Sequence, residues 1–447
     1  MTVLVTGARG FIGRHLVEAL GRLPNTEVIE CDVGSREADL ERGLRTADVI
    51  FHLAGVNRPK NDSEFQTGNA DFTTQLCAKL ALLRDWQSLP ASPVLVFSSS
   101  IQAALENPYG LSKRRAEQAI AEWAGRQGGK AYIFRLKNVF GKWCRPNYNS
   151  VTATFCYNIA HDLPITISDP DRELELVYID DVIEAFLGVL GECKAGGGRR
   201  EAGTSGRAVA CEFREVGRSF KVTLGELAAR IRSFRESRCS LVLPDFSDPF
   251  NRCLYATYLS YLDGPDFAYA LEQKTDPRGT LAEFVKSPSA GQIFVSRTRP
   301  GVTRGNHYHH TKTEKFLVLE GEAIIRFRRV AGEGSGKGQG LGEVGSRESG
   351  KHQAVNAEQS LTATSSAPAC SLRVPAGTDL IEHRVSGRDF KVLDIPPGYT
   401  HSIENVGPGE LVTLFWASEV FDPTKPDTYA MSVLGEAGSG KGLEVNG

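Results

Sequence analysis

A tyrosine and a lysine four residues apart, Tyr109 and Lys113, form the first group that could do chemistry. On a helix this spacing places both side chains on one face, one turn apart. A nearby ammonium favours the phenolate and lowers the pKa of a tyrosine from about 10. The phenol could then exchange a proton with a substrate oxygen while a hydride moves at the carbon. The alternative is an ordinary amphipathic helix start.

Three histidines and a glutamate in the last third of the chain form a second group. His307 and His309 are two residues apart, which places both imidazoles on one side of a strand. Glu314 and His401 complete the set. Three imidazoles and one carboxylate suit a divalent ion such as Zn, Fe, Mn or Ni. The alternative is a histidine cluster on a surface hairpin.

A glycine-rich turn, Gly7-x-x-Gly10-x-x-Gly13, separates an aliphatic run from a helical pattern near the N-terminus. Glycines at such a junction permit a tight turn and let the backbone approach a pyrophosphate. We therefore predict a dinucleotide site. Its predicted contacts are Gly7, Arg9, Gly10, Phe11, Ile12, Gly13, Asp32, Arg36, Leu53, Ala54, Gly55 and Lys113.

The residues around this site give conflicting signals about the cofactor. Asp32 follows the second predicted strand, where an acidic residue would bond the ribose hydroxyls of NAD. Arg9 and Arg36 would instead suit the 2′-phosphate of NADP. Asp32 could equally be a solvated turn residue.

Strands and helices alternate through the first half of the chain, which predicts a doubly wound, Rossmann-type parallel sheet. We expect strands at residues 3–5, 28–31, 49–53, 94–97 and 132–135 and a helix at 109–124. Ligands of such sheets lie beyond the carboxyl ends of the strands. Gly7, residues 52–55 and the serines at 98–100 all follow strand ends, so they should line one crevice.

After residue 275 the pattern changes to short strands without long helices, which predicts an antiparallel jelly roll. We expect strands at 293–295, 315–319, 323–327, 391–395 and 411–415. A helical pattern at 220–234 ends before Leu243-Pro244-Asp245-Phe246, where we place the boundary between domains 1–245 and 246–434. A glycine-rich surface loop at 196–206, a low-complexity insertion at 331–378 and a flexible tail at 435–447 interrupt or follow these domains.

Composition excludes several other classes of protein. The 52 basic and 54 acidic residues give a net charge of −2, without a basic stripe for nucleic acid. Nothing resembles a membrane span or a secretory leader. The nine cysteines contain no Cys-x-x-Cys, which indicates free thiols in a reducing compartment. We therefore expect a cytoplasmic protein.

Six motifs of the first half occur in a characteristic order. They are Thr6-Gly7-x-x-Gly10-x-x-Gly13, His52-Leu53-Ala54-Gly55, Ser98-Ser99-Ser100, Tyr109-x-x-x-Lys113, Asn138-Val139-Phe140-Gly141 and Tyr178-Ile179-Asp180-Asp181-Val182. This series resembles the extended short-chain dehydrogenases/reductases that act on nucleotide sugars. The resemblance implies Tyr109 as acid/base, Lys113 as its partner, Ser100 as hydroxyl helper and Asn138 as a substrate contact. The short interval between serine and tyrosine leaves the choice among the three serines open. It also lacks the Asp-Glu pair of the 4,6-dehydratases, which favours carbonyl reduction.

The second half resembles the metal-binding cupins. The first cupin motif is matched by Gly301, His307, His309, Glu314 and Gly321, and the second by Pro396, Gly398, His401 and Asn405. The leading glycine of the second motif is replaced by Phe390. Motifs around Arg278 and Arg304 further resemble sugar 3,5-epimerases, which implies that these arginines bind a nucleotide diphosphate. That likeness leaves His307 as ligand, base, or each in turn.

The fusion of these two domains resembles the bifunctional capsular-polysaccharide enzymes of the UDP-N-acetyl-L-fucosamine pathway. The resemblance implies that the cupin epimerises C3 of a UDP-4-keto-6-deoxy-N-acetylhexosamine. The reductase would then reduce the C4 ketone to UDP-2-acetamido-2,6-dideoxy-L-talose. It also implies NADPH, with NADH as the alternative, one divalent metal, zinc, and a homodimer. Two alternatives remain: a dTDP-sugar epimerase–reductase of the rhamnose type, and a non-catalytic cupin sensor on a degenerate reductase.

Overall fold

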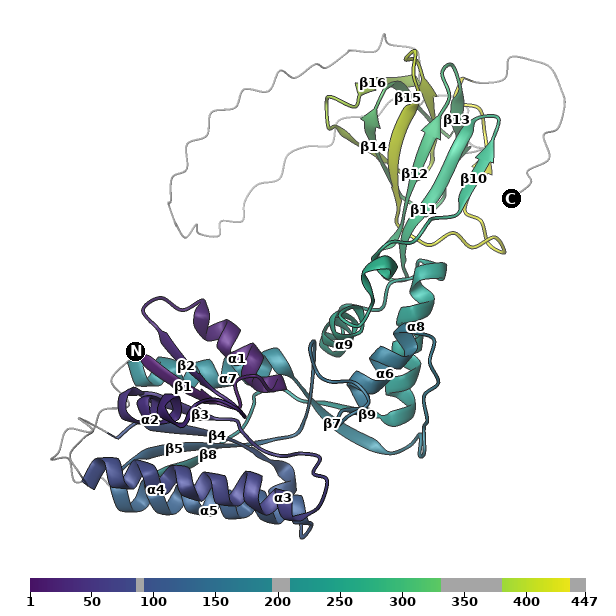
Figure 1. The fold of residues 1–447 in the computed structure, drawn as a ribbon. Helices are drawn as coiled ribbons and strands as arrows, with labels where there is room; N and C mark the ends of the chain where they lie inside the picture. The colour runs from purple at the N-terminus through teal and green to yellow at the C-terminus, as the bar shows by residue number, and fades with distance from the viewer. Residues whose placement is uncertain (86–91, 195–209, 331–379, 435–447) are drawn as a thin grey trace, which may run out of the picture. The chain divides into compact units, whose positions relative to one another are not determined.

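The computed structural model describes residues 1–85, 92–194, 210–330 and 380–434. The chain divides into two compact units, Met1–Tyr269 and Ala270–Gly447 (Figure 1). The loop expected at 196–206, the insertion expected at 331–378 and the tail expected at 435–447 lie outside the described residues. Within the described ranges, no helix has the length and apolar character needed to cross a membrane.

The first unit contains a six-stranded parallel sheet in the order β2-β1-β3-β4-β5-β8. Its strands are β1 (Thr2–Thr6), β2 (Glu27–Cys31), β3 (Val49–His52), β4 (Val94–Ser100), β5 (Lys130–Leu136) and β8 (Cys211–Arg214). The predicted doubly wound, Rossmann-type sheet is confirmed. The central strands β3, β4 and β5 are mostly buried because helices cover both faces of the sheet.

Two groups of helices cover the two faces of this sheet (Figure 1). One face packs against α1 (Phe11–Gly21) and α7 (Ile179–Glu192), and the other against α2 (Glu37–Thr46), α4 (Phe72–Asp85) and α5 (Pro108–Gln127). The short helix α3 (Ser63–Phe65) precedes α4. Successive residues of a strand point to opposite faces, so Val3 and Val5 join the first core and Leu4 the second.

A smaller layer completes the first unit. It contains β6 (Asn138–Phe140), β7 (Glu173–Tyr178), β9 (Phe220–Thr223), α6 (Val151–Ala160), α8 (Leu224–Ser240) and α9 (Pro249–Leu259). The helix expected from Phe220 begins only at Leu224, because Thr223 forms a capping box with Glu226. The residues before Thr223 form strand β9. Helix α9 shares its core with α6 and α8, so the unit extends to Tyr269 rather than to the expected boundary at 245.

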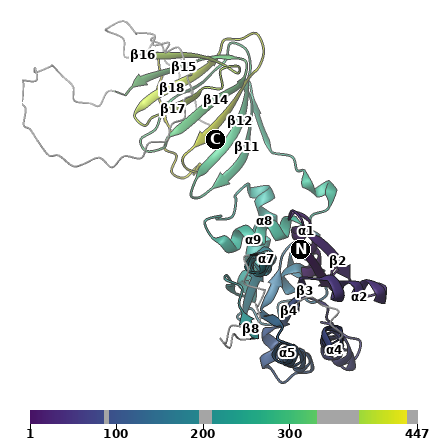
Figure 2. The same ribbon diagram turned by 90° about the vertical axis from the view of Figure 1, so that its left-hand side faces the viewer.

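The second unit consists of two antiparallel sheets, as predicted for a jelly roll (Figure 2). Their orders are β10-β11-β12-β19-β14-β17 and β16-β15-β18-β13-β20. The strands are β10 (Gln273–Asp276), β11 (Gly279–Ser287), β12 (Gly291–Thr298), β13 (Thr303–Tyr308), β14 (Glu314–Glu320), β15 (Glu322–Arg329), β16 (Leu380–Ser386), β17 (Val392–Ile395), β18 (Tyr399–Asn405), β19 (Leu411–Ala417) and β20 (Tyr429–Ala430). Side chains of both sheets, including Phe316, Ile325 and Phe415, form its core.

Candidate active sites

The glycine-rich turn after β1 has no room for side chains. Gly7 has φ +73°, and a Cβ there would lie 2.6 Å from the backbone nitrogen of Ala54. A Cβ on Gly13 would lie 2.1 Å from the carbonyl oxygen of Gly7. Helix α1 therefore starts directly against the turn, and Gly10 closes it by donating its N–H to Gly7 at 3.0 Å. This geometry suits a dinucleotide pyrophosphate at the helix N-terminus.

The three charged residues predicted near the cofactor have different surroundings. The Asp32 carboxylate accepts hydrogen bonds from the backbone N–H groups of Arg9 and Val33, both at 2.7 Å. The Arg36 guanidinium donates twice to Asp39, at 3.0 Å each. The exposed guanidinium of Arg9 makes no hydrogen bond or ion pair with any described residue. Among the three, Arg9 is therefore the charge best placed to meet a phosphate.

Tyr109 and Lys113 both lie near the start of α5, as expected, but their electrostatics differ from the prediction. The Lys113 ammonium donates to the carbonyl oxygen of Ser98 at 3.1 Å. Burial lowers the pKa of Lys113 to about 8, against the opposing charge of Glu117. Burial raises the pKa of Tyr109, and a hydrogen bond with Ser100 opposes that rise. The predicted lowering of the Tyr109 pKa by Lys113 is therefore wrong for this structure.

The three serines at the end of β4 have separate roles. The Ser99 hydroxyl donates to the buried Glu117 carboxylate at 2.6 Å, and Arg135 holds the same carboxylate at 2.7 Å. Ser98 offers its carbonyl oxygen to the lysine. The Ser100 hydroxyl is the group that opposes the rise in the Tyr109 pKa, and it accepts a hydrogen bond from the backbone N–H of Gln102 at 3.2 Å. This arrangement favours Ser100 as the hydroxyl helper.

The sequence analysis did not identify two polar residues near Lys113, Glu117 and Asn69. Glu117 lies one helical turn beyond Lys113, and this four-residue spacing could have indicated it. Asn69 accepts from the backbone N–H of Val56 at 2.8 Å, and no sequence motif indicated it. A Cβ on Gly55 would lie 2.8 Å from the Asn69 amide oxygen and 3.2 Å from the Lys113 ammonium. Gly55 thus leaves space for both polar groups.

The predicted substrate contact Asn138 donates its amide to the carbonyl oxygen of Glu175 at 3.3 Å.

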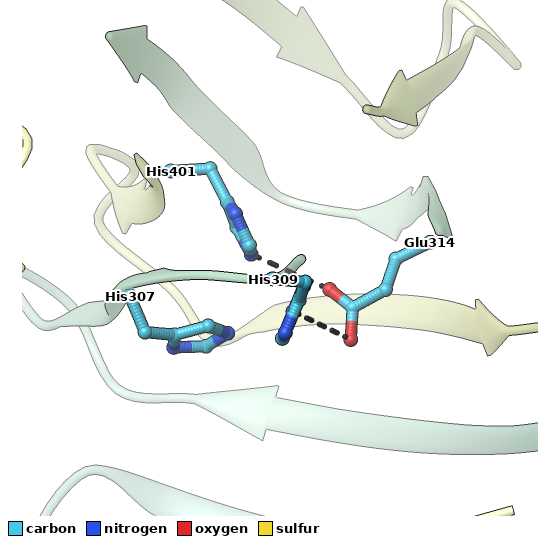
Figure 3. Close-up of side chains that lie close together, drawn as sticks. All are labelled: His307, His309, Glu314 and His401. Atoms are coloured by element: carbon cyan, nitrogen blue, oxygen red, sulfur yellow. Dashed lines mark ion pairs between the residues drawn. The ribbon is translucent and has the colours of Figure 1, made fainter. Parts of the chain in front are cut away.

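The second unit gathers all four predicted metal ligands (Figure 3). Each offers one ligand atom, and these atoms lie within 4.8 Å of one another. His307 on β13 pairs in register with His401 on β18, while Glu314 begins β14. The carboxylate oxygens of Glu314 lie 3.5 Å from Nε2 of His309 and 3.3 Å from Nε2 of His401.

Backbone carbonyls determine which imidazole nitrogens face this cluster. Nδ1 of His309 donates to the carbonyl oxygen of Asp427, and Nδ1 of His401 donates to that of Tyr399 at 3.4 Å. A carbonyl can only accept, so each Nδ1 carries the proton and each Nε2 presents a lone pair. Both Nε2 atoms are buried without a hydrogen-bond partner among the described residues. Buried lone pairs beside a carboxylate fit a divalent cation.

The charge states of the cluster agree with that fit. Burial, with a contribution from His401, lowers the pKa of His307 to about 3, which keeps its imidazole neutral. Burial raises the pKa of Glu314, whereas positive charge and hydrogen bonds from His309 and His401 lower it overall; with both imidazoles neutral, a bound cation would supply that positive charge. Neutral imidazoles and an ionised carboxylate are the forms that bind metals.

A cavity of about 200 Å³ is lined by three of the four predicted ligands, His307, Glu314 and His401. Its lining also includes both predicted phosphate-binding arginines, Arg278 and Arg304. Nε of Arg304 donates to Thr298 at 2.9 Å, while one of its terminal nitrogens is buried without a partner among the described residues. The structure therefore brings three predicted ligands and the predicted anion-binding groups to one cavity.

Comparisons with known proteins cover both units. Residues 3–202 match the NAD dependent epimerase/dehydratase family, and residues 274–339 and 345–429 match the polysaccharide biosynthesis C-terminal domain. The chain is 40% identical over 433 residues to the UDP-2-acetamido-2,6-beta-L-arabino-hexul-4-ose reductase of Pseudomonas aeruginosa. That alignment covers 97% of this chain and 99% of the reductase.

Solved structures give the same result. The crystal structure of the capsular polysaccharide assembling protein CapF from Staphylococcus aureus superposes with a TM-score of 0.75 at 39% identity, over 97% of this chain and 100% of that chain. A structure of CapF with the inhibitor 3-isopropenyl-tropolone has a TM-score of 0.71 at 35% identity, over the same shares. The chain therefore belongs to the family that contains the Staphylococcus aureus CapF protein and the Pseudomonas aeruginosa reductase.

Proposed function

We propose that this chain carries out two consecutive reactions on one UDP-linked sugar. The second unit epimerises C3 of a UDP-4-keto-6-deoxy-N-acetylhexosamine, and the first unit reduces the C4 ketone with NADPH. The product is UDP-2-acetamido-2,6-dideoxy-L-talose. The observation that carries this proposal is the presence of both sites in a chain that aligns with a UDP-sugar reductase over almost its whole length.

The reductase site supplies the acid for ketone reduction. The nicotinamide cofactor supplies the hydride when it is bound. Tyr109 donates a proton to the C4 oxygen, and Ser100, already within hydrogen-bond reach of Tyr109, holds the same oxygen. Lys113 lies one helical turn beyond Tyr109, and its buried ammonium donates to the carbonyl oxygen of Ser98.

The cupin site suits proton removal from C3. A C4 ketone acidifies the C3 proton, and His307, in the wall of the cavity, is positioned to accept it, while solvent returns a proton to C3 on the opposite face. His309, Glu314 and His401 would hold a zinc ion, whose positive charge stabilises negative charge near it. Arg278 and Arg304 bind the diphosphate from the wall of the same cavity. Reduction at C4 removes the acidity of C3, so epimerisation comes first.

A double substitution, His309→Ala with His401→Ala, tests the division of labour. We expect it to lose zinc, measured by elemental analysis, and to lose deuterium exchange at C3, measured by NMR in heavy water. It should still reduce a ketone that is supplied already epimerised. His383→Ala, on β16 of the same unit, is the matched control and should keep both activities. Normal C3 exchange in the metal-free protein would overturn the metal-dependent assignment.

The nucleotide is tested separately. Product analysis with UDP- and dTDP-linked 4-keto sugars, each with NADPH and NADH, distinguishes the proposed substrate from a rhamnose-type one. A preference for the dTDP sugar would replace the proposal. Failure to oxidise either nicotinamide with any keto sugar would favour the non-catalytic alternative.

A further inference from the structure

Two loops of the first unit bring two arginines to one tyrosine ring. Arg58 follows β3, and the centre of its guanidinium lies 6.0 Å from the centroid of the Tyr148 ring. Arg145 lies 5.0 Å from the same centroid. Both side chains belong to exposed residues, and neither guanidinium forms an ion pair or hydrogen bond with any described residue. Two positive charges thus converge without a protein carboxylate to balance them.

The loop that carries Tyr148 and Arg145 has a constrained conformation. Trp143 has φ +66°, which a bulky side chain rarely adopts. Its ring packs on His15 of α1, with the centroids 4.5 Å apart. The hydroxyl of Tyr261 donates to the carbonyl oxygen of Cys144 at 2.6 Å. Strained backbone persists where its surroundings enforce it, and it concentrates at functional sites.

The position of both loops connects them to the reductase crevice. Arg58 lies three residues beyond Gly55, where an added Cβ would be 3.2 Å from the Lys113 ammonium. Tyr148 lies two residues before Ser150, which caps the N-terminus of the ten-residue helix α6. The helix dipole therefore adds positive potential near the ring. Arg58 follows the carboxyl end of β3, and its contact with Tyr148 places the second loop near it, at the end of the sheet where ligands of this fold bind.

We propose that Arg58 and Arg145, positioned by Tyr148, bind the diphosphate of the sugar nucleotide while the first unit reduces it. The identity of this ligand rests on the proposed function. Two guanidiniums match the two charges of a diphosphate and can each bond two of its oxygens. Arg58 and Arg145 belong to the first unit and Arg278 and Arg304 to the second, so each unit has its own arginines for holding the nucleotide.

Kinetics of the full chain test this assignment. Arg58→Gln and Arg145→Gln should each raise the KM for the epimerised UDP-keto sugar by about tenfold, the usual order for a lost charged hydrogen bond. The KM for NADPH should stay unchanged. Arg126→Gln is the matched control, because that arginine is also exposed and pairs weakly, at 3.8 Å from Glu122. Tyr148→Phe should retain binding, whereas Tyr148→Leu should weaken it.

Two kinetic outcomes would overturn the assignment. If only the KM for NADPH rises, Arg58 and Arg145 bind the cofactor phosphate instead of the sugar nucleotide. If neither KM changes, the two arginines bind no ligand of the reductase. UDP binding by calorimetry separates this assignment from the proposed function. The full chain for that measurement carries Arg278→Gln and Arg304→Gln, which silence the second unit. Arg58→Gln and Arg145→Gln are then added to this background, and UDP binding is measured again. Loss of UDP binding supports the site even if the protein reduces no UDP-keto sugar, whereas retained binding refutes it.

Discussion

The two sites of this chain differ in how completely the protein assembles them. In the second unit, four ligand atoms lie within 4.8 Å, and backbone carbonyls orient two of the imidazoles. In the first unit, Tyr109 and Lys113 share a helix face, yet the ammonium donates to the carbonyl oxygen of Ser98. The candidate metal site is therefore preorganised by the protein, whereas in the candidate reductase site the Lys113 ammonium is engaged by Ser98.

The difference follows from the elements that carry the residues. Paired strands fix which residues oppose each other, and His307 pairs with His401 after a β-bulge between Gly305 and His307. The reductase residues instead follow the ends of separate strands, on turns whose shape depends on glycines and caps.

The largest effect should come from the reductase site. Tyr109→Phe should slow ketone reduction by about 10²–10⁴-fold, because it removes the proton donor. Deuterium incorporation at C3 should continue, since the cupin cavity is unchanged. Tyr132→Phe, which removes a hydroxyl that donates to Glu192 at 2.9 Å, is the control for loss of a phenol elsewhere. Unchanged hydride transfer in the Tyr109 variant would refute its role as acid.

The preorganisation of the cupin site should depend on Asp427. Its carboxylate accepts from the backbone N–H groups of His310, Thr311 and Lys312 at 2.8–2.9 Å. Asp427→Asn should release this segment, misplace His309 and weaken zinc affinity about 10–100-fold, as loss of outer-shell support usually does. Chelator competition measures the affinity. Asp422→Asn, whose carboxylate caps only its local turn, should leave the affinity intact.

A smaller effect, on the KM for NADPH, should distinguish Arg9 from Arg36, the two arginines predicted to lie near the cofactor. Arg9→Gln should raise the KM for NADPH about tenfold and leave the KM for NADH unchanged, because it removes one charged contact to the 2′-phosphate. Arg36→Gln should change neither, because Asp39 already engages that guanidinium. If NADH proves to be the better cofactor and Asp32→Ala reverses the preference, then Asp32 holds the ribose and this prediction is wrong.

The sequence predicted features that depend on local pattern. Alternating strands and helices predicted the parallel sheet, and ligand spacing predicted a metal cluster that the fold does assemble. Contacts between distant segments had no such signal. Asp427 lies 118 residues from His309, whose imidazole it orients. The direction of the Lys113 ammonium was also missed, because helical spacing places a side chain on a face but does not choose its partner.

One departure from the cupin pattern has a structural cost. Phe390 stands where the second motif has its leading glycine, and it adopts φ +44° in the turn between β16 and β17. A non-glycine residue in this left-handed region costs about 1–2 kcal/mol. Its side chain is 74% exposed, so the ring contributes little burial to offset that cost.

Phe390→Gly should therefore raise the free energy of unfolding of the second unit by about 0.5–1 kcal/mol, after the entropic cost of glycine is subtracted. Denaturant unfolding followed by a probe in that unit measures the change. Phe284→Gly is the matched control, because Phe284 is 54% exposed on β11 and has no positive φ. Glycine there relieves no strain and should lower stability. Equal losses at both positions would show that the turn accommodates Phe390 without strain, and the metal site should bind zinc equally well in either variant.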